Sequence, residues 1–219
     1  MLVHKKEVIK DFKLGIVPIL WPIVIICGLI LPADFSTAAM LFIVCFIMLF
    51  VGGAKLKHLS AMIGVSIAGF AILILLNLAF PGLLPRVDTW QKRITSFESG
   101  SQKENYQAET AKRAVANGFL FGKGPGKGHV KNDLYSAQSD FIYASSIEEF
   151  GSIFGGLGLV IMYTILCFRS SRIMNKSDSL FGAYVVVGLS FLLDFQSLLN
   201  MGVGVNLFPV TGQPRPLIS

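Results

Sequence analysis

The stretch FSTAAMLFIVCFIMLFVGGA, residues 35–54, contains no charged side chain and is almost entirely apolar. At a rise of 1.5 Å per residue, a helix of this length is about 30 Å long, which matches the hydrocarbon core of a bilayer. Charged residues flank the run, with Asp34 before it and Lys55 after it. We therefore predict that residues 35–54 form a membrane-spanning helix.

Further apolar runs lie on both sides of this one, at residues 15–32, 59–85, 150–168 and 179–210, the last interrupted at Asp194. Because 53% of the 219 residues are hydrophobic, the chain has too much apolar surface for one water-soluble core. We expect an all-α integral membrane protein, a polytopic bundle of about five transmembrane helices with one large extracytoplasmic loop. Residues 1–81 hold three of these helices, residues 82–145 form the loop, and residues 146–219 hold two helices and an outer-side re-entrant or interfacial segment.

The net charge of +6 does not indicate a nucleic-acid partner, because the basic residues do not gather on one soluble face. Their positions between the apolar runs instead indicate how the chain is oriented in the membrane. Short loops rich in Lys and Arg stay in the cytoplasm, so we place the N-terminus and the loops near residues 55 and 172 on the cytoplasmic side. The three cysteines all lie inside predicted spans, and we find neither a disulfide nor a metal-ligand pattern.

Asp140 is the most informative ionisable residue, since it lies in the sequence SDF just before the fourth apolar run. An aspartate at this place can cap a helix N-terminus, and the same carboxylate can act as a base. Glu148 and Glu149 follow at about 12 Å along a continuous helix, too far to flank one glycosidic bond with Asp140. They are interfacial residues, partners of nearby cations, or functional residues.

The segment GKGPGKG, residues 122–128, combines flexible backbone with positive charge. Its backbone N–H groups and lysines can bind a diphosphate, or the segment can be a flexible linker. It is not a Walker A loop, because Gly128 follows Lys127 where that motif has Ser or Thr.

Polar residues also accompany the second and fifth apolar runs. Asp34 fits a turn residue or an N-cap of the second run. Asp194, Gln196 and Asn200 lie inside the fifth run, where polar groups are costly and either bond to another helix or line a substrate path.

Several stretches together match one known family in order and spacing. They are PADFSTA (32–38), Trp90 with Arg93 and Ile94, YQ (106–107), AVANGFLFGKGPGKG (114–128), SDFI (139–142) with EEFG (148–151), and residues 196–219. This combination resembles the SEDS family (FtsW/RodA/SpoVE) of peptidoglycan glycosyltransferases, with FtsW as the nearest branch. The resemblance implies ten-helix enzymes of the bacterial cytoplasmic membrane, of which this chain would be a fragment without the N-terminal helices and the last helix.

The resemblance also implies an activity and its participants. The protein would polymerise lipid II, an undecaprenyl-diphosphate disaccharide-peptide, during cell division or cell-wall growth. Its partners would be a class B penicillin-binding protein transpeptidase, other divisome proteins and membrane lipid.

Asp140 takes the place of the family's essential aspartate and is the predicted catalytic base. Lys123, Arg93 or a divalent cation such as magnesium would stabilise the phosphate charge that develops. The predicted substrate-binding residues are Lys123, Arg93, Gln107, Ser139, Glu149, Asn200 and Asp34.

Two other functional classes fit the composition equally well. A flippase or transporter of a lipid-linked precursor would use the polar groups of the fifth apolar run as a path. If the protein is a noncatalytic scaffold of the division machinery, variants of Asp140 would keep partner binding and complementation.

Overall fold

The computed structural model describes residues 2–3, 9, 11–31, 33–79, 102–128, 140–208 and 216. These residues form helices joined by turns and contain no strand, which confirms the all-α prediction. The chain divides into two compact units, one of Met1–Gln91 with Ile173–Gly188 and the other of Lys92–Arg172 with Leu189–Ser219.

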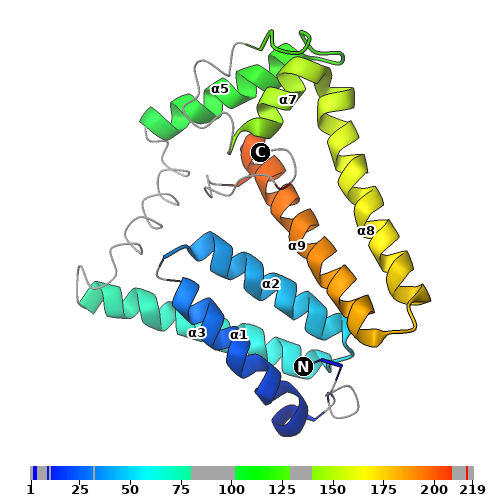
Figure 1. Cartoon of the computed structure of the whole chain (residues 1–219). Coiled ribbons are helices and arrows are strands. Elements are labelled where there is room, and N and C mark those ends of the chain that lie inside the picture. The colour runs from blue at the N-terminus through cyan, green and yellow to red at the C-terminus, as the bar shows by residue number, and fades with distance from the viewer. Residues whose placement is uncertain are drawn as a thin grey trace. The chain divides into compact units, whose positions relative to one another are not determined.

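The first unit contains the helices of the first three apolar runs (Figure 1). They are a π-helical turn at Phe12–Ile16, α1 (Val17–Ile30), α2 (Phe35–Val51) and α3 (Leu56–Ala79). Side chains from these elements form a continuous apolar core that includes Ile16, Ile19, Leu49, Leu59 and Met62. Each predicted apolar run of this unit is therefore helical, and the helices pack through the same residues that make the runs apolar.

Helix α2 begins at Asp34, which is its N-cap. The Asp34 carboxylate accepts hydrogen bonds from the backbone N–H groups of Ser36 at 2.9 Å and Thr37 at 3.3 Å, and from the Thr37 hydroxyl. These bonds satisfy N–H groups that have no partner within the helix. The N-cap interpretation of Asp34 is confirmed.

Replacing Asp34 with alanine is expected to destabilise the protein by about 1 kcal/mol, the usual cost of losing such a cap. Thermal or denaturant unfolding in detergent micelles measures the effect. Asp11→Ala is the matched control, because Asp11 is the N-cap of the turn at Phe12–Ile16 and makes no side-chain capping bond. Equal destabilisation by the two substitutions would contradict the capping role.

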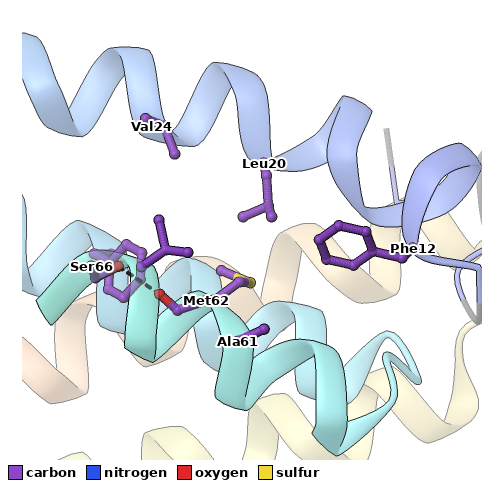
Figure 2. A pocket seen from close by; sticks show the side chains of 8 residues that line it. Phe12, Leu20, Val24, Ala61, Met62 and Ser66 are labelled. Carbon is purple, nitrogen blue, oxygen red and sulfur yellow. Dashed lines mark hydrogen bonds between the residues drawn. The ribbon is translucent and has the colours of Figure 1, made fainter. Parts of the chain in front are cut away.

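An apolar pocket of about 90 Å³ opens between α1 and α3 (Figure 2). It is lined by Phe12, Leu20, Val24, Phe42, Ala61, Met62, Val65 and Ser66. The one hydroxyl in this lining, that of Ser66, donates to the Met62 carbonyl at 2.9 Å. The lining is therefore almost entirely apolar and does not suit a sugar or a phosphate.

The second unit contains α5 (Gln102–Gly118), α7 (Ile142–Gly151), a π-helical segment at Ser152–Leu157 and most of α8 (Gly158–Lys176). It also contains α9 (Leu180–Gly204) from residue 189 onward. Helix α5 packs on α7 (Figure 1).

The chain reverses direction at Gly151, between α7 and Ser152–Leu157. Gly151 has φ 82° and ψ 168°, a backbone conformation that is essentially restricted to glycine. After this turn, Gly155 lies so close to α7 that an added Cβ would be 2.2 Å from the Ser146 carbonyl oxygen. The apolar run of residues 150–168 therefore starts at a reversal between two helical segments, a feature that its composition did not predict.

Among the described residues, three helical stretches are long and apolar enough to cross a membrane: Phe12–Ile30, Ile142–Lys176 and Leu180–Gly204. The second of these combines α7, the π-helical segment and α8. Phe35–Val51 and Leu56–Ile72 are apolar helical stretches of shorter length. All five apolar runs are thus helical over most of their described residues, while the number of five spans and the boundaries at residues 81 and 145 stay predictions.

Candidate active site

Polar side chains gather in the interior of the second unit. The buried ones are Thr110 on α5, Asp140, Ser145, Glu148 and Glu149 in and before α7, and Ser170, Ser190, Asp194, Ser197 and Asn200 on α8 and α9. Burial of polar groups is costly unless other groups compensate it, and buried carboxylates are rarer still. This concentration of carboxylates makes the interior around α7 the candidate site.

Asp140 lies in the turn that precedes α7 and is 7% exposed. Its carbonyl accepts a long hydrogen bond of 3.5 Å from the Asn200 side-chain amide of α9. The N-cap of α7 is Phe141, which makes no side-chain capping bond, and Asp140 precedes it by one residue. The capping role of Asp140 and its role as a base both stay predictions.

An apolar cluster fixes the turn that carries Asp140. Phe141, which is 1% exposed, packs with Ala111 and Ala114 of α5, Ala144 of α7 and Val203 of α9. Small residues on α5 let this helix approach the turn closely. Residues of α5, α7 and α9 thus hold the backbone of the turn that carries the Asp140 side chain.

The glycine-rich segment 118–128 lies against the C-terminal end of α7. The Lys123 N–H donates to the Glu148 carbonyl at 2.9 Å, and the Gly124 N–H donates to the Glu149 carbonyl at 3.0 Å. From the other side, the Ser152 N–H donates to the Phe119 carbonyl at 2.8 Å. These bonds make the segment a docked part of the unit and contradict the flexible-linker interpretation.

The same bonds limit what the segment can offer to an anion. Its N–H groups at Gly122, Lys123, Gly124 and Lys127 all donate to carbonyls of the chain. A diphosphate would therefore not be bound by these four groups, contrary to the expectation from the glycine pattern. The segment can still attract such a ligand through the positive charge of its lysine side chains.

Lys123 contacts a buried carboxylate. Its ammonium nitrogen is 3.1 Å from Glu148 Oε1, and the Glu148 side chain is completely buried while that of Lys123 is 33% exposed. The sequence analysis left open whether Glu148 and Glu149 are partners of cations, and for Glu148 this is confirmed. Glu148 is absent from the predicted substrate-binding set, and since Lys123 lies 25 residues away, no local pattern could have revealed the pair.

Glu149 faces the end of the same segment. A Cβ added to Gly128 would lie 3.3 Å from Glu149 Cγ and 3.0 Å from Glu148 Oε2, so both glutamates approach the Gly128 backbone. Glycine at residue 128 therefore makes room for two carboxylates.

The other predicted residues are distributed as follows. Gln107 is half-buried on α5, and Asn200 is buried on α9 beside Asp140. Asp34 belongs to the first unit, while Arg93 and Ser139 lie outside the described residues. Within the second unit, the structure thus brings Asp140 together with Asn200, and Lys123 together with Glu148.

Ser197 is a buried polar residue that the sequence analysis did not select. It lies three residues before Asn200 on α9, is fully buried, and donates its hydroxyl to the Leu193 carbonyl. The three-residue spacing of Asp194, Ser197 and Asn200 was the available signal, because it places all three toward one side of the helix. No group of three or more His, Cys, Asp or Glu residues that could hold a metal ion occurs in the part of the chain that the structure describes.

Long apolar helices and a buried carboxylate site define an integral α-helical membrane protein. The chain belongs to the FtsW/RodA/SpoVE family of cell cycle proteins, whose sequence profile matches residues 1–219. With this membership, the apolar helices make it a protein of the bacterial cytoplasmic membrane.

Curated relatives agree with this assignment. Stage V sporulation protein E of Bacillus subtilis is 33% identical over 100% of this chain and 58% of its own length. A protein of Aliivibrio salmonicida called probable peptidoglycan glycosyltransferase FtsW is 31% identical over 100% of this chain and 54% of its own length. The chain thus spans little more than half of the curated relatives that it matches.

A solved structure has the same fold. A chain from "Structural coordination of polymerization and crosslinking by a peptidoglycan synthase complex" aligns with a TM-score of 0.67 at 22% identity, covering 100% of this chain and 60% of that chain. At this identity the likeness concerns the fold, and it confirms the predicted class of membrane helix bundle.

Proposed function

We propose that the natural protein carrying this chain is a peptidoglycan glycosyltransferase that polymerises lipid II into glycan strands, during cell division or cell-wall growth. The observation that carries the proposal is the burial of the Asp140 carboxyl in a turn held by α5, α7 and α9, beside Asn200. Relatives called probable peptidoglycan glycosyltransferase FtsW support the same reaction class.

The reaction needs one base. An acceptor sugar hydroxyl oxygen forms a bond with the anomeric carbon of the donor, while the bond from that carbon to the diphosphate oxygen breaks. The diphosphate leaves without a proton, so one carboxylate suffices to take the proton of the attacking hydroxyl. Asp140 is that base in our proposal.

Positive charge near the leaving diphosphate would stabilise the transition state. Lys123 is the described candidate, because one third of its side chain stays exposed while it pairs with Glu148. Arg93, Gln107, Ser139, Glu149, Asn200 and Asp34 complete the proposed substrate-binding set, and a magnesium ion is the alternative charge stabiliser.

The basic residues set the proposed orientation. Arg169 and Arg172 are exposed at the end of α8, as are Lys55 and Lys57 after α2, and by the positive-inside rule these helix ends would lie in the cytoplasm. The N-terminus of the chain is then cytoplasmic, and α5 with the glycine-rich segment is extracytoplasmic. A class B penicillin-binding protein transpeptidase is the proposed partner on that outer side.

The direct test is polymerisation of purified lipid II by the natural protein in detergent or proteoliposomes. We expect glycan strands that lengthen with time. Movement of lipid II across the bilayer without any glycan product would contradict the proposal and favour a flippase.

A flippase is the second candidate because Asp194, 7% exposed, is a carboxyl group inside a candidate span. Ser190 lies one helical turn before Asp194 on α9 and is hydrogen-bonded to Ser170 of α8. If Asp194 has no part in glycan polymerisation, Asp194→Asn should keep the polymerisation rate within about threefold of wild type, because Asn preserves the shape and polarity of the side chain. Initial rates with lipid II measure this, and a selective loss of lipid II transport in Asp194→Asn would favour the second candidate.

A further inference from the structure

Glu148 joins helix α7 to the glycine-rich segment 118–128 through both its backbone and its side chain. Its carbonyl accepts the Lys123 N–H at 2.9 Å, and its Oε1 is 3.1 Å from the Lys123 ammonium nitrogen. The neighbouring Glu149 carbonyl accepts the Gly124 N–H at 3.0 Å. We infer that Glu148 is a positioning residue, whose ion pair with Lys123 fixes the glycine-rich segment on α7 for binding of the substrate diphosphate.

The two members of the pair differ in their access to water. Glu148 is completely buried, so its carboxylate depends on groups of the protein to compensate for lost hydration. Lys123 is 33% exposed and can turn its ammonium group to solvent if Glu148 is replaced. Loss of the lysine is therefore the more damaging of the two changes.

Close backbone packing makes the placement of the segment precise. A Cβ added to Gly118 would lie 2.1 Å from the Ile147 carbonyl oxygen, and one added to Gly122 would lie 2.3 Å from the Glu149 carbonyl oxygen. The segment therefore touches the α7 backbone closely before Lys123, and the hydrogen bond from the Gly124 N–H to the Glu149 carbonyl continues the contact after it. The ion pair fixes the Lys123 side chain in this contact.

The inference deepens the proposed function and rests on it, since a diphosphate substrate is what gives the placement of Lys123 a role. Asp140 precedes the N-terminus of α7, while Glu148 lies near its C-terminal end. Loosening the segment should therefore affect the binding of substrate more than the proton transfer.

The test compares variants of the natural protein by hydrogen exchange of the amides at Lys123 and Gly124. Glu148→Gln is expected to raise exchange about tenfold, as loss of a contact between directly coupled groups does, and Lys123→Met is expected to raise it further because it leaves the buried Glu148 without its cation. Lys123→Arg keeps the charge and should retain protection. In the double variant Lys123→Met with Glu148→Gln, the rise should be smaller than the product of the two single effects.

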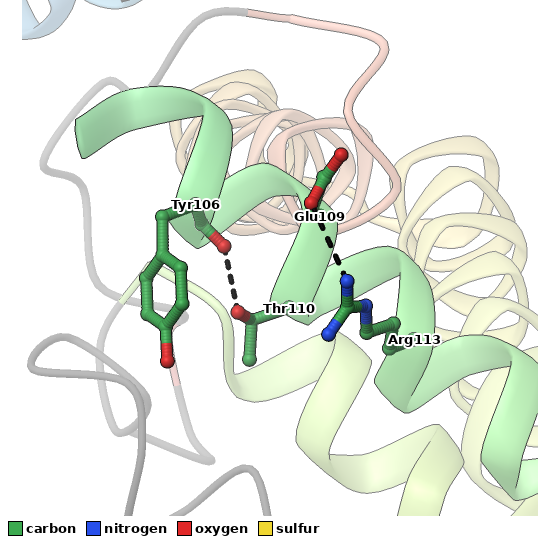
Figure 3. A network of polar contacts seen from close by, with 4 residues as sticks. All are labelled: Tyr106, Glu109, Thr110 and Arg113. Carbon is green, nitrogen blue, oxygen red and sulfur yellow. Dashed lines mark hydrogen bonds and ion pairs between the residues drawn. The ribbon is translucent and has the colours of Figure 1, made fainter. Parts of the chain in front are cut away.

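An exposed ion pair on α5 supplies the matched control. Arg113 lies one helical turn after Glu109, and its Nη2 is 3.6 Å from Glu109 Oε2 (Figure 3). The two side chains are 75% and 66% exposed. Such a pair contributes little to stability. Glu109→Gln should leave exchange at Lys123 and Gly124 unchanged.

Kinetics with lipid II separate positioning from chemistry. Glu148→Gln should raise KM about tenfold and lower kcat far less than Asp140→Asn does, because it loosens the placement of Lys123 and does not remove the base. A fall in kcat as large as that of an Asp140 variant, at unchanged KM, would overturn the inference and place Glu148 in the chemical step.

Unchanged exchange in both single variants would also overturn it, as would single effects that simply multiply in the double variant. If Glu148→Gln does not fold, the comparison of Lys123→Met with Lys123→Arg decides the matter in the same assay. Exchange is measured without substrate, so absence of polymerisation by the wild-type protein would contradict the proposed function alone.

Discussion

Replacing Asp140 with asparagine is expected to lower the rate of glycan polymerisation by about 100-fold or more, the usual contribution of a general base. Asparagine has nearly the same shape as aspartate but cannot accept the proton of the attacking sugar hydroxyl. The turn around Asp140 is held by Phe141 and its apolar neighbours, which the substitution leaves in place. Initial rates of polymer formation from lipid II, together with a thermal unfolding curve, measure the effect.

Asp178→Asn is the matched control for this experiment. Asp178 is an exposed aspartate in the turn between α8 and α9, outside the candidate site, so the same chemical change there should leave the rate unaltered. A folded Asp140→Asn protein that polymerises lipid II at the wild-type rate would eliminate Asp140 as the base. A noncatalytic scaffold would then be the better interpretation.

The helices could be predicted from the sequence because their cause is local. A run without charge, such as residues 35–54, needs a helix to satisfy its backbone in lipid, and the structure has α2 at Phe35–Val51. Asp34 also could be assigned as a cap from its place before this run, since capping involves only the next three residues. Local rules therefore gave correct results wherever the interaction partner was near in sequence.

The reversal at Gly151 could not be predicted in the same way. Gly151 and Gly155 have the spacing of a helix-packing motif, and that spacing is compatible both with a continuous helix and with a turn. What decides between them is contact with a residue 31 positions earlier, since an added Cβ at Gly151 would meet the Leu120 carbonyl oxygen. The apolar run was correctly predicted as helical, but its hairpin was not visible.

The candidate site was only partly predictable for a related reason. Asp140 was selected from its place before a span, but its contact with Asn200 joins residues 60 positions apart. The pairing of Lys123 with Glu148 likewise depends on the docking of the glycine-rich segment on α7. Sequence patterns suggested which residue types matter, and tertiary packing determines which of them meet.

Replacing Gly151 with alanine is expected to destabilise the protein by about 4 kcal/mol or more, which is exceptional for a single substitution. Two independent costs combine. The backbone at φ 82° and ψ 168° is strained for any residue with a Cβ, and that Cβ would lie 2.3 Å from the Leu120 carbonyl oxygen. The yield of folded protein in detergent and its unfolding temperature measure the effect.

Other glycines of the chain separate the two costs. Gly126 has φ 75° with nothing within 4 Å of an added Cβ, so Gly126→Ala should show the backbone strain alone, about 1 kcal/mol. Gly118 has no positive φ but has a carbonyl oxygen 2.1 Å from the added Cβ, so Gly118→Ala should show the steric cost alone. Gly64 in α3 has neither, and Gly64→Ala should be neutral or slightly stabilising, because alanine favours a helix.

A Gly151→Ala protein as stable as Gly126→Ala would mean that the close contact between α7 and the 118–128 segment does not hold the hairpin. The docking of Lys123 on Glu148 would then lose the backbone support on which its precise placement depends.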